Sequence, residues 1–426
     1  MSPAVLLIST LDTKARETMY LRRRIEDAGV KVLLMDLSMG VASTASCEIA
    51  PEKVARSAGW NIRDIQRSNE RSVITAAMIQ GAIKIAVELF RRGELGGVVG
   101  LGGSTGSLMA GDVMRALPFG LPKVMISSTA ALPGLASRYI GTGDLMLFHS
   151  VVEIAGLSPL LINVLDRAAA AVCGMLDIPP ATPEQMRHRK QRLVAMSMFG
   201  PCERCAYELR LRLEKAGYSV IGFSAAGVCD RAMEDMIGQG YFVGVVDLAP
   251  GGVGEELLGG MRAAGPHRLE AAGRMGLPQV IAPGGVNLMS PLKSRYKADY
   301  HERRKYDLDK LRTFLRLSPE ELIQVARAFA DKLNRSRGPI KFLIPTRGWA
   351  SFDRGGGAVY DPTEDGLFYL ELKRRLKPQV EAIEVDANIE DDAFVEALYQ
   401  AFVSFFPAGH VRETGDGIDP FPAAAS

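Results

Sequence analysis

The sequence predicts an α/β protein of two Rossmann-like domains, each built on a mostly parallel sheet. Short β-branched apolar runs alternate with amphipathic segments, which is typical of βαβ units. The chain has 426 residues, more than one ordinary core accommodates. Two segments also recur in the same order: GVVGLGGSTGSLMAG (97–111) aligns with GVVDLAPGGVGEELLGG (244–260), and LPKVMISS (121–128) with LPQVIAPG (277–284). This internal repeat indicates two related domains.

The first domain is expected to span residues 1–184. Its predicted strands are residues 4–9, 30–37, 97–101 and 124–127. A helix over residues 12–28 joins the first two strands, and a second helix over 73–92 leads into the third. After an irregular stretch, one or two helices complete the domain by residue 176.

The second domain is expected to span residues 185–426. It follows a proline-rich linker and the charged run 187–190, neither of which is suited to a core. The pattern then restarts, and the predicted elements are strands 193–198 and 219–223, a helix over 202–216, and strands 341–344 and 382–385. Because ligands of such sheets bind at the carboxyl ends of the strands, the two glycine turns are expected to line a cleft between the domains.

Composition argues against several classes of protein. The net charge is +2, from 51 basic and 49 acidic residues, so we expect neither nucleic acid nor a membrane as a partner. The first apolar run is too short for a signal peptide. Five cysteines, an odd number, do not make a disulfide framework, which indicates a reducing cytoplasm. A homo-oligomer, most often a dimer, is the default expectation.

The glycine turn that follows the third predicted strand is the strongest candidate for a binding site. Gly102, Gly103 and Gly106 leave backbone N–H groups accessible at the start of a helix, and Ser104, Thr105 and Ser107 add hydroxyls. The chain has no Gly-Lys dipeptide, hence no Walker loop.

Three interpretations of this turn remain open. It is a cradle for phosphates, a purely structural turn, or the nucleophile elbow of a serine hydrolase. The third interpretation arises because residues 102–106 match G-x-S-x-G, with Ser104 as the nucleophile and Asp144 and His149 as candidate partners.

The end of the first predicted strand favours the phosphate interpretation. Thr10, Asp12, Thr13 and Lys14 crowd a strand-to-helix turn that is adjacent, in such a sheet, to the glycine turn. Lysine supplies a flexible point charge suited to phosphate, and the threonines supply hydroxyls. Asp36 ends the second predicted strand, 22 residues after Lys14, where nucleotide-binding sheets often place an acid for the ribose.

Several motifs together resemble a known family. They are STLDTK (9–14), GLGGSTGS (100–107), LPKVMISSTA (121–130), YIGTGDLMLFH (139–149), FSAAGVCDRAMEDMIGQG (223–240), PHRLEAAGRMGLPQV (266–280) and SPEELIQVARAFADKLN (318–334). This set is similar to the ATP-binding domain family of the tomato mosaic virus resistance protein, which includes many uncharacterised bacterial relatives. The resemblance implies two Rossmann-like halves, with ATP bound in the first.

The resemblance also implies the residues that contact ATP. They are Thr10, Asp12, Thr13, Lys14, Gly102, Gly103, Ser104, Thr105, Gly106 and Ser107, with Ser127, Ser128, Thr129, Gly141, Thr142 and Asp144 closing the pocket. In the second half the chain departs from the family, since residues 223–227 read FSAAG where relatives carry a histidine. A different second substrate, or none, is therefore expected.

The expected function is an ATP-binding protein, with or without Mg²⁺, and with no metal site of its own. It is either an enzyme that uses ATP on a small acidic metabolite or a nucleotide-sensing module without turnover. The residues expected to hold the second ligand are Asp247, Gly251, Gly252, His267, Arg268 and Gly284. Cys202 and Cys205 are structural, a redox pair or part of a metal site.

Overall fold

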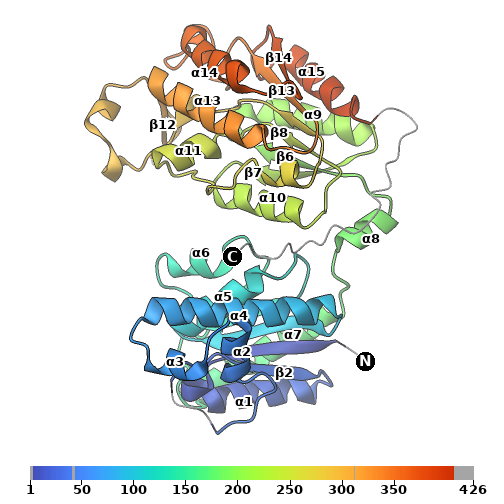
Figure 1. Cartoon of the computed structure of the whole chain (residues 1–426), viewed down its shortest axis with the longest axis vertical. Helices are drawn as coiled ribbons and strands as arrows, with labels where there is room; N and C mark the ends of the chain where they lie inside the picture. Colours follow the sequence, from blue (N-terminus) through green and yellow to red (C-terminus); the bar gives the residue numbers. More distant parts are fainter. Residues whose placement is uncertain (1–2, 41–43, 311, 407–426) are drawn as a thin grey trace. The chain divides into compact units, whose positions relative to one another are not determined.

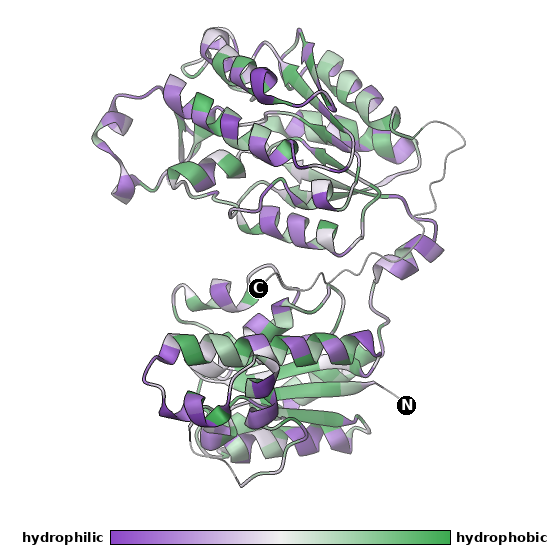
Figure 2. Ribbon diagram, viewed as in Figure 1, coloured by the Kyte–Doolittle hydropathy of each residue, from purple (hydrophilic) through white to green (hydrophobic). Residues whose placement is uncertain are grey.

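The computed structural model describes residues 3–40, 44–310 and 312–406. The chain divides into two compact units, residues 1–182 (unit 1) and 183–426 (unit 2) (Figure 1). The predicted boundary, after residue 184, lies two residues further along the chain. Each unit consists of a parallel sheet with helices around it, which confirms the predicted α/β class. Figure 2 shows that the strands of both sheets are predominantly hydrophobic, whereas most helices carry both polar and apolar residues.

Unit 1 contains a five-stranded parallel sheet, sheet A, with the order β2-β1-β3-β4-β5. Its strands are β1 (Ala4–Ser9), β2 (Val32–Asp36), β3 (Leu95–Gly102), β4 (Lys123–Ser127) and β5 (Met146–His149). Its helices are α1 (Leu11–Asp27), α2 (Pro51–Ser57), α3 (Ile62–Arg67), α4 (Arg71–Arg91), α5 (Ser104–Arg115), α6 (Leu135–Ile140) and α7 (Pro159–Leu176). The strand order reverses between β1 and β3, so the switch point of this doubly wound sheet lies at their carboxyl ends.

The core of unit 1 follows from the hydrophobic pattern. All six residues of β1 are buried, and α1 contributes Leu11, Leu21 and Ile25 at helical spacing. Helices α4 and α7 have the length and the mean hydropathy of membrane spans. Both pack on sheet A, and α7 contributes six buried residues to its core, as the core helix of a globular domain does.

Unit 2 contains a six-stranded parallel sheet, sheet B, with the order β14-β13-β9-β8-β6-β7, and a three-stranded antiparallel sheet, β10-β12-β11. Its strands are β6 (Leu193–Met198), β7 (Ser219–Ser224), β8 (Gly244–Asp247), β9 (Gln279–Ile281), β10 (Leu288–Met289), β11 (Lys305–Asp307), β12 (Thr313–Arg316), β13 (Ile340–Pro345) and β14 (Val380–Val385). Its α-helices are α8 (Pro183–His188), α9 (Glu203–Lys215), α10 (Val228–Gly238), α11 (Gly252–Leu258), α12 (Ala271–Arg274), α13 (Pro319–Leu333), α14 (Pro362–Arg375) and α15 (Asp392–Val403).

The two parallel sheets have the same topology. Counted among the strands of sheet B alone and read from β7, the order is second-first-third-fourth-fifth, as in sheet A, with β14 added at the edge. The two pairs of aligned sequence segments occupy β3 and β8, and β4 and β9. The sequence repeat therefore corresponds to a structural repeat.

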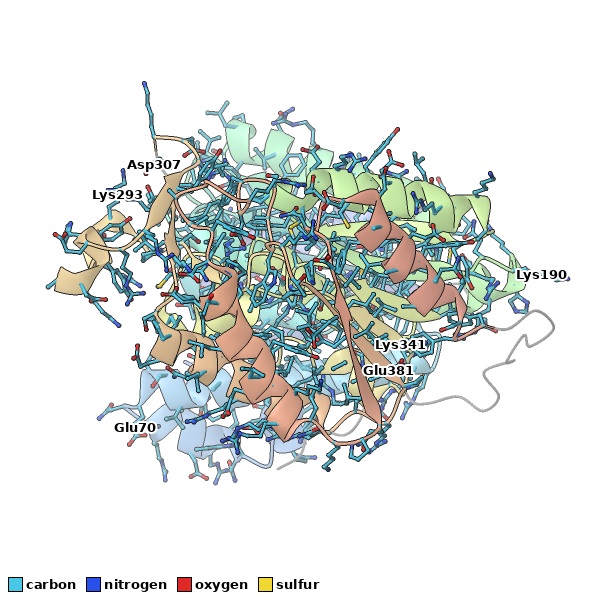
Figure 3. All side chains as sticks on the ribbon, turned by 90° about the horizontal axis from the view of Figure 1, so that it is seen from above. Glu70, Lys190, Lys293, Asp307, Lys341 and Glu381 are labelled. Carbon is cyan, nitrogen blue, oxygen red and sulfur yellow. The ribbon has the colours of Figure 1, made fainter. Side chains whose placement is uncertain are left out.

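Two features at the periphery of unit 2 can be followed in the side-chain view of Figure 3. Lys341 and Glu381 lie side by side on β13 and β14, with their charged atoms 3.6 Å apart (Figure 3). Lys293 and Asp307 mark the segment between β10 and β12, which extends from the body of unit 2 in the same figure. This segment carries the antiparallel strand β11, which the repeat does not predict.

Some elements differ from the sequence-based prediction. Strand β5 lies in the stretch that the sequence predicts to be irregular. Its residues are partly or largely exposed in the structure, so no alternation of buried apolar residues marks it as a strand. The short helices α2 and α3, and helix α8 in the predicted linker, were also not expected.

Candidate functional site

The glycine turn lies at the switch point of sheet A, between β3 and α5. Gly103 caps α5 in an extended conformation without a side-chain hydrogen bond, and the N–H of Ser107 donates to the carbonyl of Gly103 at 2.9 Å. Within the described residues, the N–H groups of Ser104, Thr105 and Gly106 have no acceptor. They point from the positive end of a 12-residue helix, which favours an anion.

The packing around the three glycines of this turn differs, and only one of them is required by it. A Cβ on Gly102 would lie 2.9 Å from the Cα of Gly106, so the tight join between β3 and α5 requires glycine there. On Gly103 the nearest atom would be the Oγ of Ser128 at 3.8 Å, and on Gly106 the carbonyl oxygen of Leu101 at 3.7 Å. These are ordinary contacts. The fold therefore does not require Gly103 and Gly106, whereas close approach of a ligand would.

A buried chain of hydrogen-bonded hydroxyls connects the glycine turn to the end of β4 and to α6. Ser107 donates to the carbonyl of Gly102 at 3.2 Å and to the Oγ of Ser127, which ends β4, at 2.7 Å. The N–H of Thr129 donates to the same Ser127 oxygen at 3.2 Å, and the Thr129 hydroxyl lies 2.8 Å from that of Tyr139. Ser107 and Ser127 are fully buried. These two buried serines position the turn, whereas Ser104 and Thr105 are exposed to solvent.

Sequence reasoning missed Tyr139. Its ring is fully buried, and its hydroxyl lies 3.5 Å from the carbonyl of Ser104, so it links α6 to the start of α5. The residue stood in a segment expected to be irregular, and nothing in the local pattern marked its hydroxyl. The run of hydroxyls at 127–129 was the available signal, since a buried chain of this kind needs a further partner.

The turn between β1 and α1 lies beside the glycine turn, since β1 and β3 are neighbours. The hydroxyls of Thr10 and Thr13 are 3.2 Å apart, and Asp12 is exposed. The ammonium of Lys14 donates to the carbonyl of Ile154 at 2.5 Å, and the backbone of Lys14 departs from helical geometry. An ammonium has three donors, so this bond leaves two available.

Asp36 has a structural role that differs from the one predicted. Its carboxylate is 3% exposed and accepts from the N–H of Leu11 at 3.0 Å, from the N–H of Ser38 at 2.9 Å and from the Ser38 hydroxyl at 2.5 Å. Burial raises its pKa. All three bonds are to Oδ1, so the buried carboxylate holds the first turn of α1, a structural role in place of the predicted contact with a ribose.

Gly141, Thr142 and Asp144 lie away from the glycine turn. Asp144 accepts from the ammonium of Lys123, the first residue of β4, at 2.6 Å and therefore lies at the amino edge of sheet A. A Cβ on Gly141 would lie 2.5 Å from the Cδ of Arg115, the last residue of α5. That end of α5 is roughly 16 Å from Ser104 along the helix. The expectation that these three residues close the pocket is corrected accordingly.

In unit 2, the predicted ligand residues Asp247 and Arg268 are paired with each other. Arg268 is fully buried and donates to both oxygens of Asp247, at 2.5 and 2.7 Å, to Asp230 at 2.8 Å and to Glu234 at 3.2 Å. Burial raises the pKa values of Asp230 and Glu234. This cluster joins α10 to β8 and is a structural ion pair, so Asp247 and Arg268 do not form an open ligand site.

The other four predicted residues of unit 2 do not form one site either. A Cβ on Gly252 would lie 2.6 Å from that of Ala264, and a Cβ on Gly284 would lie 2.4 Å from the carbonyl oxygen of Leu248. These glycines, and the buried Gly251, are required by internal packing. His267 is 78% exposed and contacts Glu270 at 3.2 Å on the surface.

Comparison with known proteins identifies the family of the chain. A model of the N-terminal domain of UPF0261, an uncharacterised protein family, matches residues 3–180, and a model of its C-terminal domain matches residues 191–406. The chain belongs to the UPF0261 family. The two family domains coincide with units 1 and 2.

Relatives of similar length occur in bacteria. A UPF0261 protein of Clostridium tetani is 32% identical, with 95% of this chain and 99% of that protein covered, and one of Brucella suis is 32% identical, with 96% and 97% covered. The ToMV resistance protein Tm-1(GCR237) of Solanum lycopersicum is 30% identical over 95% of this chain, which spans 56% of that protein. A solved structure of the lipolytic enzymes LipS and LipT covers 50% of this chain at 11% identity, and its TM-score of 0.29 carries no argument.

The cysteine pair of this UPF0261 chain is structural. Cys202 and Cys205 are fully buried and free, and burial raises the pKa of both thiols, so neither is a ready thiolate. No group of three His, Cys, Asp or Glu residues suited to a metal ion occurs in the described part of the chain.

The nucleophile-elbow interpretation of Ser104 has no geometric support. An elbow holds its serine on a strained turn, but Ser104 is not among the non-glycine residues with positive φ, and it begins a regular helix. Among the described residues, no histidine bonds to its hydroxyl. The ring of His149 lies 3.4 Å from the carbonyl of Ser127 instead.

Proposed function

We propose that unit 1 of this UPF0261 protein binds ATP, with the phosphates on the N–H groups of Ser104, Thr105 and Gly106. The observation that carries this proposal is the uncapped start of α5 at the switch point of sheet A. Neither Gly103 nor Gly106 is required by packing, and both leave room for a phosphate oxygen to approach the backbone. A helix start with free amides and no Cβ in the way is the arrangement that phosphate-binding turns use.

The neighbouring turn supplies the remaining polar groups. Ser104, Thr105 and Thr13 expose hydroxyls, and Lys14 adds a positive charge. Asp12 is exposed, and one carboxylate together with phosphate oxygens and waters is a donor set that Mg²⁺ accepts. Mg²⁺ would then bind with the nucleotide, held by Asp12. In one version of this proposal, the protein is an enzyme that consumes ATP with a small acidic metabolite as its second substrate. In the alternative, it is a nucleotide-sensing module without turnover.

Calorimetry with ATP, ADP and AMP in the presence of Mg²⁺ tests this proposal. Since the amides and Lys14 bind phosphates, we expect affinity to fall from ATP to ADP and to be lost or very weak for AMP. Equal affinity for the three nucleotides would show that the base and ribose, not the turn, determine binding. ADP release measured with and without small acids separates an enzyme from a module, since a module releases none.

A further inference from the structure

Unit 2 contains a group of buried polar atoms without partners at the carboxyl edge of sheet B. Among the described residues, the atoms without a hydrogen-bond partner include Nη1 of Arg262, Oε2 of Glu255, Oδ1 of Asn287, Oδ1 of Asp353 and Oδ2 of Asp365. Buried polar atoms are nearly always paired, so each of these needs a partner. They surround the turn after β9, residues 284–287, at the edge where sheets of this type bind ligands.

Arg262 is held by one edge and leaves the other edge available. Its Nε donates to Oε1 of Glu255 at 2.9 Å and its Nη2 lies 2.8 Å from the same oxygen, so the Nε–Nη2 edge is paired and Nη1 is left without a partner. Oε1 of Glu255 also accepts from the N–H and the hydroxyl of Ser290, at 2.9 and 2.8 Å. The guanidinium lies 4.4 Å from the ring centroid of Phe199 and 5.4 Å from that of Phe314. A guanidinium fixed in this way presents its terminal fork, which matches a carboxylate in a bidentate geometry.

The backbone beside this fork is glycine. A Cβ on Gly251 would lie 3.5 Å from Nη1 of Arg262 and 3.0 Å from the carbonyl oxygen of Gly285. The turn after β8, which in unit 1 is open to an anion, is therefore occupied in unit 2 by a buried cation. Arg262 is 9% exposed, so nine-tenths of it is out of contact with water.

The acceptor side is equally well fixed. The Nδ2 of Asn287 donates to Asp353 at 2.9 Å and to Asp365 at 3.0 Å. The N–H of Trp349 donates to Asp353 at 2.8 Å, and Arg316 donates to Asp365 at 2.7 Å. These bonds use one oxygen of each carboxylate and the nitrogen of the amide. They leave Oδ1 of Asn287 and Oδ1 of Asp353 as oriented acceptors, which suit hydroxyl donors.

An aromatic stack leads from the surface to the guanidinium. The rings of Tyr306 and Phe352 are parallel at 3.8 Å, and Phe352 stacks on Phe314 at 6.1 Å. Tyr306 is 37% exposed, whereas Phe314 is buried. Phe352 lies in the loop before α14, where a Cβ on Gly355 would have no neighbour within 4 Å. The exposed part of this loop around Gly355 is the side from which a ligand would reach Arg262.

We propose that unit 2 carries a second ligand site, for a small hydroxycarboxylate. The carboxylate pairs with the fork of Arg262, and the hydroxyls donate to Asn287 and Asp353. A ligand with both groups satisfies donors and acceptors at once, which a simple anion or a polyol does not. The site is separate from the Asp247–Arg268 cluster and does not depend on nucleotide binding in unit 1.

Tryptophan fluorescence tests the site in the full chain. The protein has two tryptophans, so a Trp60→Phe variant leaves Trp349, whose backbone N–H donates to Asp353, as the only reporter. We expect glycerate to produce a saturable change with a Kd at least tenfold lower than that of glycerol or of propionate, at constant ionic strength. Propionate carries only the carboxylate and glycerol only the hydroxyls. No saturable change with glycerate, or a glycerate affinity equal to that of glycerol or of propionate, would overturn the proposal.

Substitution of Arg262 is the second test of the proposed site. Arg262→Gln removes the fork and is expected to weaken glycerate binding at least tenfold, whereas Arg295→Gln, the same change at an exposed arginine of unit 2, leaves it unchanged. Equal glycerate affinity in both variants would contradict the assignment. The comparison of glycerate, glycerol and propionate needs no change in the site, so it decides the question even where Arg262→Gln fails to fold.

Discussion

Single residues determine which of the two related glycine turns is open. In unit 1, no Cβ clash constrains Gly103 or Gly106, and the amides at the start of α5 are free of partners among the described residues. In unit 2, the side chain of Arg262 lies against Gly251. The amides at the start of α5 therefore favour an anion directly, whereas at the related turn of unit 2 only the side chain of Arg262 does so.

Lys14 is predicted to contribute to nucleotide binding rather than to stability alone. Its ammonium bonds to the carbonyl of Ile154, and its other donors are available to phosphate. We expect Lys14→Gln to weaken ATP binding by about 1 to 3 kcal/mol, as loss of a charged hydrogen bond does. Calorimetry measures this effect. A variant with lower stability to urea but unchanged ATP affinity would show that Lys14 only ties α1 to the loop before α7.

Asp365 is predicted to make unit 2 less stable as pH rises. Burial, opposed by Arg316, raises its pKa from 3.8 to about 7. The folded state then binds the proton more tightly than the unfolded state, so stability is greatest below pH 4 and falls as pH rises through 7. The slope is roughly 1.4 kcal/mol per pH unit and the total about 4 kcal/mol.

Urea unfolding followed by Trp349 fluorescence, in the Trp60→Phe background, measures this dependence. In Asp365→Asn the group does not titrate, so the fall in stability with rising pH is expected to be shallower by the contribution of this one carboxyl. Parallel pH profiles for the two proteins would contradict the assignment of the slope to Asp365.

At the scale of elements, the glycine turn was predictable because strand, turn and helix each have a clear local pattern. The same is true of the Thr10–Lys14 turn. Elements whose position depends on distant partners were not predictable. Asp144 belongs to the opposite edge because it pairs with Lys123, a residue 21 positions away, and Arg268 is internal because three carboxylates surround it. No local spacing reports such pairings.

The join between β3 and α5 gives a prediction about stability. Gly102→Ala places a methyl group 2.9 Å from the Cα of Gly106, and the backbone must shift to relieve this contact. We therefore expect the free energy of unfolding to fall by about 1 to 3 kcal/mol. Gly103→Ala meets nothing closer than 3.8 Å and should change stability by no more than about 0.5 kcal/mol. Urea titration compares the two. Equal losses would mean that the turn is packed more uniformly than these distances indicate.

At the scale of the whole molecule, the repeat found in the sequence correctly predicted two sheets of one topology. It did not predict how far the copies have diverged in chemistry. Residues 102–107 and 249–254 align, yet the second copy is buried against Arg262, Ala264 and Gly285. The added sheet β10-β12-β11 also brings Phe314 and Tyr306 to that edge. Sequence alignment of the halves alone therefore did not indicate Arg262, which lies beside the aligned turn.

Two units with two separate sites predict ligand-specific stabilisation. ATP is expected to raise the urea midpoint reported by Trp60 in unit 1, and glycerate that reported by Trp349 in unit 2. A ligand at 100 times its Kd stabilises its unit by about 2.7 kcal/mol. Single-tryptophan variants, Trp349→Phe and Trp60→Phe, measure each unit. Stabilisation of both units by ATP alone would contradict separate sites.

The most direct test of the phosphate turn is Mg²⁺-ATP calorimetry on Gly106→Asp, with Gly106→Asn as its matched control. A Cβ at this position would meet nothing closer than the carbonyl oxygen of Leu101 at 3.7 Å, and an acid in the first turn of α5 stabilises the helix by about 0.3 to 1 kcal/mol. A carboxylate there repels phosphates, so we predict that Gly106→Asp folds at least as stably as wild type and binds ATP at least tenfold more weakly than Gly106→Asn. Wild-type ATP affinity in Gly106→Asp would contradict the account.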